Sequence, residues 1–442
     1  MSEILEPVAI PSAGARAANS HLPAPKQLSE LLRPKLHFTP RAGWINDPHG
    51  VTFHEGAYHA FYQYVPEKTV WSVECHWGHA VGRDLLSLTE VEPAVFPGDG
   101  DDGIWSGSLV VADGQATIFY TTATAPDFSQ ARIRSAQPAD EDWMQWQKGP
   151  VLVEAPRSLD LVGFRDPYVH RDTDGWRMVV GAGRSDGTAM AISYTSADLA
   201  SWEYDGIVLE RSGNEKDPVW TGALWECPQV FEVDGRAVIL TSAWQDNRPF
   251  HVVYAIGSYQ SGVFEPETWG RLTYGDSYYA PTFFLDAAAR PCVTFWLREN
   301  QEPEEGWAGA HSVPFVLSLE NDRLVAAPHP DVAAHRSEST PSGMLPEFAA
   351  DVLWDVDDDD ELVVTSGTEQ IISLVRKRGE VQVTVGSNVR VVPAAGPIRV
   401  ILDGPIVEMA SSAGLFSTRI YPNGQPTRVQ TRSEQAVVYP LV

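Results

Sequence analysis

Three carboxylate residues stand out in this chain of 442 residues, because each lies in a short motif with proline and an aromatic residue. Asp47 lies in the segment WINDPHG, Asp166 in FRDP and Glu226 in WECP. Hydrolysis of a glycosidic bond needs two carboxyl groups in different environments, one ionised as the nucleophile and one protonated as the acid. A setting between tryptophan and cysteine is less polar than one after asparagine, so we expect Glu226 to be the acid. Taken singly, each motif is also typical of a turn that ends a strand.

These motifs recur at a regular distance along the chain. Asn46-Asp47-Pro48 is followed by Ser106-Gly107-Ser108 and then by the motifs of Asp166 and Glu226, in steps of about 60 residues. The aromatic pair Tyr278-Tyr279 follows after a slightly shorter step. A period of this length suits a four-stranded propeller blade with its loops, and residues 36 to about 320 would hold five such units.

The elements that must position these residues read as short strands. Segments rich in β-branched and aromatic residues are bounded by Gly, Pro, Asp and Asn, at residues 58–65, 116–122, 176–182, 237–244 and 292–297. Such segments at even spacing, without a long amphipathic helix, predict an all-β barrel, sandwich or propeller.

The chain changes character at both ends of this region. Residues 1–35 are rich in Ala, Pro and Ser and lack periodicity, which predicts an N-terminal arm. Residues 36–320 form the predicted catalytic domain, and 321–345 read as a linker. From 346 to 442 apolar and polar residues alternate between turn signals, which predicts an antiparallel β-sandwich.

Composition narrows the classes of partner. The formal net charge of −27 disfavours nucleic acid and anionic membrane surfaces, and no segment has the length and apolarity of a membrane span. Fifteen tryptophans suit a site for a neutral sugar, a small-molecule substrate. Three widely spaced cysteines show neither a disulfide framework nor a metal pattern, so we expect no metal, no cofactor and a cytoplasmic protein, or a secreted one if a leader has been removed. The oligomeric state is not indicated.

Taken together, the motifs resemble glycoside hydrolase family 32, the β-fructosidases. WINDPHG, WSGS, FRDP and WECP stand in the order of the family motifs. Further segments are similar to family segments over most of the chain after residue 36; they are LHFTP, FYQY, HWGHA, GWAGA and FSTRIYP. The resemblance implies a five-bladed β-propeller followed by a C-terminal β-sandwich, and a retaining mechanism.

The resemblance also implies roles for single residues. Asp47 matches the nucleophile, Glu226 the general acid/base and Asp166 the carboxylate that stabilises the transition state. Substrate-binding positions are matched by Asn46, Gln63, Trp71, Trp105, Ser106, Arg165 and Tyr278.

Several positions depart from the family pattern. His49 replaces an asparagine in the nucleophile motif, and Gln229 stands where relatives have an acidic residue. Within 273–282, Thr273, Ser277 and Thr282 replace acidic and glutamine positions, which concerns the preference for the leaving group. Trp71 lies one residue farther from His76 than is usual in the family.

The sequence therefore predicts a retaining β-fructofuranosidase that hydrolyses terminal β-D-fructofuranosyl residues of sucrose and short fructo-oligosaccharides. A fructosyltransferase and a hydrolase of levan or inulin are the alternatives within the family. A sugar-binding propeller without catalysis is the alternative from another class, and the presence of all three carboxylates disfavours it.

Overall fold

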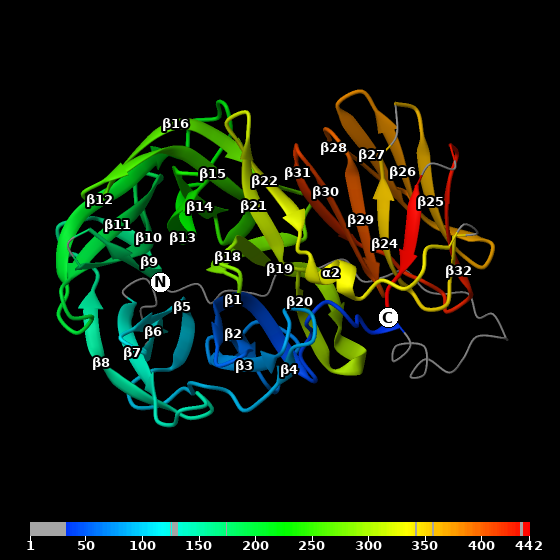
Figure 1. The fold of residues 1–442 in the computed structure, drawn as a ribbon. Helices are drawn as coiled ribbons and strands as arrows, with labels where there is room; N and C mark the ends of the chain where they lie inside the picture. Colours follow the sequence, from blue (N-terminus) through cyan, green and yellow to red (C-terminus); the bar gives the residue numbers. More distant parts are fainter. Residues whose placement is uncertain are drawn as a thin grey trace.

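The computed structural model describes residues 32–123, 125, 131–173, 175–340, 343–355, 358–433 and 436–442. Most of the predicted arm, 1–35, thus lies outside the described residues. The described chain is almost entirely β-strand, and it forms a propeller followed by a sandwich, as predicted (Figure 1). No helix among the described residues is both long enough and apolar enough to cross a bilayer.

Five groups of strands surround the propeller axis, and each begins with its innermost strand (Figure 1). The first two groups contain β1 (Gly43–His54), β2 (Ala57–Val65), β3 (His76–Gly82) and β4 (Thr89–Glu90), then β5 (Gly103–Ala112), β6 (Gln115–Ala123), β7 (Arg132–Pro138) and β8 (Trp146–Glu154). The third contains β9 (Leu161–Asp172), β10 (Gly175–Arg184), β11 (Thr188–Ser196) and β12 (Glu203–Ser212). The last two contain β13 (Leu224–Val233), β14 (Arg236–Gln245), β15 (Arg248–Gln260) and β16 (Val263–Arg271), then β18 (Tyr278–Leu285), β19 (Pro291–Glu302), β21 (Phe315–Glu320) and β22 (Arg323–Pro328).

One strand closes the ring between the last blade and the first. β20 (Trp307–His311), which follows the short 3₁₀ helix η2 (Pro303–Glu305), pairs antiparallel with β19 and parallel with β1. The two blades therefore share one sheet of nine strands. This pairing covers an edge of β1 that would otherwise leave backbone groups without partners.

The predicted strand segments are confirmed, and burial explains their composition. β10 is buried on both faces, because Met178 and Val180 belong to one apolar core and Val179 to another, and residues 178–183 are all buried. A strand covered on both faces reads as a continuous apolar run rather than an alternating one.

The C-terminal part is a sandwich of two six-stranded sheets around a core that includes Trp354, Ile372 and Val400. One sheet contains β17 (Thr273–Tyr274), β31 (Gly414–Arg419), β30 (Ile406–Ser411), β29 (Ile398–Asp403), β24 (Ala349–Trp354) and β33 (Val437–Pro440). The other contains β23 (Met344–Leu345), β32 (Thr427–Thr431), β25 (Glu361–Ser366), β26 (Glu369–Lys377), β27 (Glu380–Val385) and β28 (Asn388–Pro393).

The two parts are joined closely. β17 leaves the propeller to pair in parallel with β31 of the sandwich, and a shared apolar core includes Leu272, Phe315 and Leu415. The stretch expected to be a linker, 321–345, is more ordered than we expected, because β22, α2 (Asp331–Ala334) and β23 lie within it. β22 belongs to the last blade because Leu324 and Ala326 are buried in the shared core and the strand pairs with β21.

Candidate active site

The same backbone irregularity recurs at one level of all five innermost strands. Their pairing with the second strand is interrupted after Ile45 in β1, Trp105 in β5, Arg165 in β9, Glu226 in β13 and Tyr279 in β18. Three of the five interruptions contain a proline, namely Pro167, Pro228 and Pro281, and in β1 the pairing resumes at Pro48. Proline has no N–H for the ladder, so it favours a bulge, and a bulge redirects the neighbouring side chains.

These bulges direct the motif residues toward the axis. Asp166, Cys227 and Ala280 take positive φ angles of 65°, 50° and 46° at equivalent positions of three blades. In β5 the unpaired residue is Ser106, and the pairing resumes at Gly107, where a Cβ atom would lie 1.9 Å from the carbonyl oxygen of Phe119. The spacing of about 60 residues in the sequence is therefore the spacing of one repeated structural position.

Asp47 is buried, and the groups that donate hydrogen bonds to it are neutral. The hydroxyl of Ser106 donates to its carboxylate at 2.6 Å, and the amide of Asn46 donates at 3.1 Å. Gln63 accepts a hydrogen bond from Asn46 at 3.3 Å and donates one to Ser106. Burial raises the pKa of Asp47 to about 6 despite the hydrogen bond from Ser106, and the charge of Glu226 adds to the rise. At pH 7 most of this carboxyl group is still ionised.

Asp166 lies beside it and is held by backbone groups. Its own N–H donates to Thr121 Oγ1 at 2.8 Å, and its carboxylate accepts the N–H of Cys227 at 2.9 Å. The Cys227 sulfur lies 3.7 Å from Asp166 Oδ2 and 3.8 Å from Asp47 Oδ2, so it stands between the two aspartates. Burial raises the pKa of Asp166, and the charges of Glu226 and Asp47 reinforce this against the opposing effect of Arg165.

Glu226 has a different environment from both aspartates. Its Oε1 accepts a hydrogen bond from Arg165 Nε at 2.7 Å, its Oε2 accepts one from the hydroxyl of Tyr279, and its side chain is 18% exposed. Our expectation of a less polar setting for Glu226 was wrong, because the guanidinium and the phenol come from other blades and the local sequence does not contain them. Arg165 is the cation that pairs with this cluster, and its own guanidinium lies over Trp244.

Aromatic residues lie close to the polar residues that contact the carboxylates. Trp71 is 41% exposed, and its ring packs edge-on against Trp105 at 6.0 Å. Trp105 is fixed by a hydrogen bond from its indole to Val73 O at 3.1 Å. On the other side, Trp44 donates to Asn46 at 3.3 Å and packs edge-on against Trp296. Exposed flat rings beside buried polar groups suit a sugar, which has apolar C–H faces and polar edges.

The structure brings together Asn46, Gln63, Ser106 and Arg165 with the carboxylates, and it excludes Tyr278. The Tyr278 side chain is 1% exposed and donates to Glu408 of the sandwich at 2.7 Å, so it cannot contact substrate. The next residue, Tyr279, occupies the site instead. Sequence reasoning also missed contacts of Cys227 and Trp44, although both stand inside the quoted motifs.

One group of possible metal ligands lies elsewhere among the described residues. Asp286, Cys292 and His329 are buried within ligand distance of one another. Asp286 Oδ2 already accepts hydrogen bonds from Arg290 and from His329 at 2.9 Å, and the guanidinium of Arg290 lies 3.1 Å from the His329 ring. A cation would be repelled by this arginine, so the expectation of no metal stays our prediction.

Comparison with known proteins agrees with this geometry. Residues 37–328 match the model for the glycosyl hydrolases family 32 N-terminal domain. A sucrose-6-phosphate hydrolase from Zymomonas mobilis is 34% identical over 323 residues, which are 68% of this chain and 62% of the relative. A cell wall β-fructofuranosidase from Zea mays is 32% identical, over 66% of this chain and 54% of the relative. The matched region thus spans less than two thirds of these curated relatives.

Solved structures are similar over nearly the whole chain. A β-fructofuranosidase from Bombyx mori, solved as a mutant in complex with sucrose, has a TM-score of 0.80 and 25% identity and covers 94% of this chain and 96% of its own. Fructan 1-exohydrolase IIa from Cichorium intybus has a TM-score of 0.74 at 22% identity, over 93% of this chain and 98% of its own. At 22% identity, the similarity to the Cichorium intybus structure shows a shared fold and no more.

Proposed function

The chain belongs to glycosyl hydrolase family 32, and we propose that it is a retaining β-fructofuranosidase acting on sucrose and short fructo-oligosaccharides. The observation that carries this proposal is the difference between the environments of Asp47 and Glu226. One carboxylate is buried among neutral hydrogen-bond donors, while the other is partly exposed and held by Arg165 and Tyr279. The names of the Zea mays and Bombyx mori relatives support the substrate class.

The first step uses both groups at once. Asp47 attacks the anomeric carbon of the fructosyl unit while Glu226 donates a proton to the departing oxygen. The bond to the leaving group breaks as the bond to Asp47 Oδ forms, and the product is a fructosyl-enzyme. Ser106 and Asn46 fix the attacking carboxylate, so little reorganisation is needed when its charge is lost.

In the second step Glu226 takes a proton from water, and that water opens the fructosyl-enzyme on the face from which the leaving group departed. Asp166 holds fructose hydroxyls, and these hydrogen bonds strengthen as positive charge develops on the sugar ring. Arg165 keeps Glu226 in place in both protonation states through its Nε donor.

The decisive experiment replaces Glu226 by glutamine. Glu226→Gln removes the acid and the base, so we expect sucrose turnover to fall by about 10³-fold or more. An activated fructoside needs little protonation, and azide needs no base, so azide should restore turnover and give a β-configured fructosyl azide. Glu232→Gln is the matched control, because Glu232 is an exposed residue on the same strand, and it should behave as wild type.

Four outcomes would count against parts of the proposal. An α-configured product would mean a single displacement and remove Asp47 as nucleophile. Absence of azide rescue would remove the acid/base role of Glu226. A wild-type chain that binds sucrose but hydrolyses neither sucrose, raffinose, inulin nor levan would be a sugar-binding propeller, and oligosaccharide products at high sucrose would indicate a fructosyltransferase.

We also propose a cytoplasmic location, where small sugars rather than polymeric fructans would be available. Cys75, Cys227 and Cys292 are all free thiols, in keeping with a reducing compartment. Fractionation of the native source with an activity assay on each fraction tests this proposal, and activity confined to the medium would contradict it.

A further inference from the structure

A partly buried arginine of β19, Arg298, binds backbone oxygens rather than a carboxylate. Its Nη1 and Nη2 atoms donate to the carbonyl oxygens of Pro249 and Phe250, at 2.7 Å each, at the start of β15. Its backbone N–H donates to Ser277 O at 2.9 Å, and its Nε donates to the same oxygen at 3.4 Å. In the part of the chain that the structure describes, Arg298 forms no ion pair, because the nearby carboxylates pair with other arginines.

The charge of Arg298 is therefore not cancelled by a direct neighbour. Carbonyl oxygens satisfy the donors of a guanidinium, but they bring no full negative charge. Burial lowers the pKa of Arg298, yet a guanidinium stays protonated in proteins. Since water screens a partly buried charge less than an exposed one, this charge acts on groups that it does not touch, and Glu226 is one of them.

Tyr279 connects this cation to the acid residue. The Cζ atom of Arg298 lies 5.0 Å from the centre of the Tyr279 ring, within the range of a cation–π contact. The Tyr279 hydroxyl donates to Oε2 of Glu226, while Arg165 donates to Oε1. Burial and the charge of Glu226 raise the pKa of the Tyr279 phenol, and the charge of Arg298 opposes that rise. The phenol is thereby a better hydrogen-bond donor to the acid.

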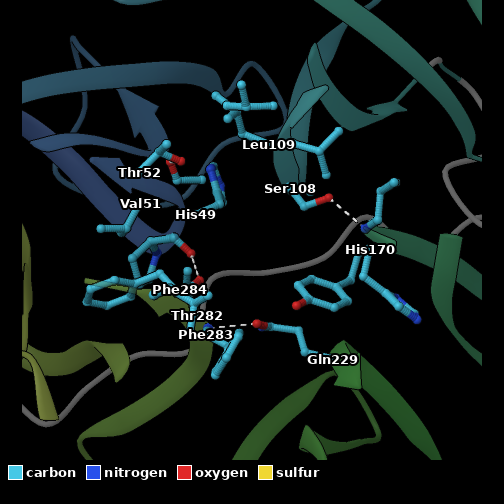
Figure 2. A pocket seen from close by; sticks show the side chains of 18 of the residues that line it. His49, Val51, Thr52, Ser108, Leu109, His170, Gln229, Thr282, Phe283 and Phe284 are labelled. Atoms are coloured by element: carbon cyan, nitrogen blue, oxygen red, sulfur yellow. Dashed lines mark hydrogen bonds between the residues drawn. The ribbon is translucent and has the colours of Figure 1, made fainter. Parts of the chain in front are cut away.

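Two side chains fix the strand of Tyr279 to the fourth blade, one on each side of that residue. Gln229 of β13 accepts the N–H of Phe283 at 2.7 Å and donates to Pro281 O. Figure 2 shows the bond between Gln229 and the backbone of Phe283. Arg298 forms the other connection, between the start of β15 and the residues that precede Tyr279. Because these connections flank the bulge after Tyr279, they fix the direction of the phenol.

Other ionisable groups act on the same pair of residues. Those that face Glu226 or Arg298 come from several elements, and they are Asp47 of β1, Arg165 and Asp166 of β9, Cys227 of β13, Asp276 and Glu299. The two central aspartates repel the ionised form of Glu226, while Arg165 attracts it. The thiol is neutral, because burial raises the pKa of Cys227 well above its usual range. Arg298 therefore adds to Arg165 in favouring the ionised acid.

We propose that Arg298 is a positioning residue for departure of the leaving group, and that it acts on Glu226 through Tyr279. This inference rests on the proposed acid/base role of Glu226. In the first step the proton of Glu226 passes to the glycosidic oxygen, which keeps the electron pair of the breaking bond. Glu226 becomes negatively charged as it loses the proton, and the fixed phenol and the cation behind it stabilise that charge. Arg298 itself transfers nothing.

Two substitutions separate the charge of Arg298 from its packing. Arg298→Met removes the charge and the donors but keeps an unbranched side chain, and Arg298→Lys keeps the charge. Arg271→Met is the matched control, because Arg271 makes the same kinds of contact elsewhere. Its Cζ atom lies 4.7 Å from the ring centre of Tyr274, and its Nε donates to Thr273 O at 2.7 Å. Tyr274 packs against the core of the sandwich.

We expect Arg298→Met to lower kcat/KM on sucrose by about tenfold or more, but on an activated fructoside by less than about threefold. A good leaving group needs little protonation, so its departure is insensitive to a weaker acid. The alkaline limb of the sucrose profile should move to higher pH in this variant, because the ionised form of Glu226 loses a favourable charge. Arg298→Lys should keep the limb in place and recover part of the rate, and Arg271→Met should behave as wild type.

The ratio of the two substrates does not depend on how much of a variant is folded, so incomplete folding cannot imitate the expected result. Equal losses on both substrates with an unmoved alkaline limb would mean a structural role only and would overturn the inference. A sucrose rate unchanged in Arg298→Met would overturn it as well, and both outcomes would leave the proposed hydrolysis standing. Full sucrose turnover by Glu226→Gln would instead remove the proposed function and this inference together.

Discussion

Two buried clusters of carboxylates in this protein differ in the groups that bind their charges. At the propeller centre, Asp47 and Asp166 have neutral donors, and the neighbouring guanidinium pairs with Glu226. At the seam between propeller and sandwich, Asp403 accepts the backbone N–H groups of residues 35, 36 and 37, and also the ring of His37. Glu408 accepts His37 Nε2 at 2.7 Å, the hydroxyl of Tyr278, and the N–H of Val313.

The charges of the seam carboxylates are therefore compensated by the His37 ring, and among the described residues no cation pairs directly with the two central aspartates. Burial lowers the pKa of His37, but the charge of Glu408 and hydrogen bonds to both carboxylates outweigh it and raise this pKa to about 9. The central aspartates have raised pKa values, which means that their ionised forms are held at a cost to the folded state. Buried carboxylates whose charge is compensated by a cation stabilise the junction. Those with raised pKa values can take part in a reaction.

An aspartate-to-asparagine substitution in each cluster should give the largest difference between the two clusters. Asp47→Asn should lower kcat on sucrose by about 10⁴-fold or more, because it removes the nucleophile. It should leave the free energy of unfolding at pH 7 unchanged or slightly higher, since a disfavoured buried charge is lost. Steady-state kinetics and thermal unfolding measure the two effects.

Asp403→Asn is the matched variant at the seam, and the effects should be reversed. The folded protein should keep its kcat within about twofold, while the free energy of unfolding falls by about 2 kcal/mol or more. A variant at Asp47 that retains more than a few per cent of wild-type kcat would remove the distinction between the clusters.

His37→Ala should have the largest effect on stability, because it leaves Asp403 and Glu408 buried without their cation. We expect a loss of about 3 to 5 kcal/mol in the free energy of unfolding, measured with denaturant at pH 7. The control is Lys35→Ala. The Lys35 ammonium pairs with Glu347 while both side chains are about half exposed, so that loss should stay below about 1 kcal/mol.

The pH dependence of stability gives a second measure of the same histidine. Its pKa is raised from 6.5 to about 9 in the folded state, so its contribution is fully present below pH 6.5 and is lost as pH rises through about 9. Wild type should therefore lose stability between pH 6.5 and 9 more steeply than His37→Ala, and equal slopes for the two proteins would contradict the assignment.

The acid limb of activity should depend on Asp47. Its carboxyl group must be ionised to attack, and its pKa is about 6, so kcat/KM should fall tenfold per pH unit below about pH 6. Ser106→Ala removes the hydroxyl that favours the ionised form, so it should move this limb to higher pH. Ser108→Ala, two residues along the same strand, should not move it. An acid limb that is identical in all three proteins would assign it to another group.

The smallest expected effects come from two adjacent tyrosines of β18, one directed to each cluster. Tyr279→Phe removes a donor from Glu226 and should lower kcat by about tenfold with little change in stability. Tyr278→Phe removes a donor from Glu408 and should cost about 1 to 3 kcal/mol of stability with kcat unchanged. Kinetics and unfolding of both variants test the comparison in one strand, and a loss of kcat in Tyr278→Phe would count against it.

These tyrosines also show which parts of the site can be predicted from the sequence. The fold class and the residues Asp47, Asp166 and Glu226 could be predicted because motif and period repeat with the blades. The choice between Tyr278 and Tyr279 could not, because the bulge after Tyr279 breaks the alternation of faces from which side-chain direction is inferred. The seam cluster was missed because His37 and Asp403 are separated by 366 residues and neither lies in a periodic pattern.

The repeated bulge has a consequence for protein engineering. Ala280 of β18 occupies the position that Asp166 and Cys227 occupy in their blades, and its φ is also positive. Its N–H donates to Ser242 just as that of Asp166 donates to Thr121. The backbone already carries a functional group at this level in the other four strands. A polar side chain introduced at residue 280 would therefore be directed toward the axis by the existing backbone. A new functional group could be added to the fifth blade in this way without a change of the main chain.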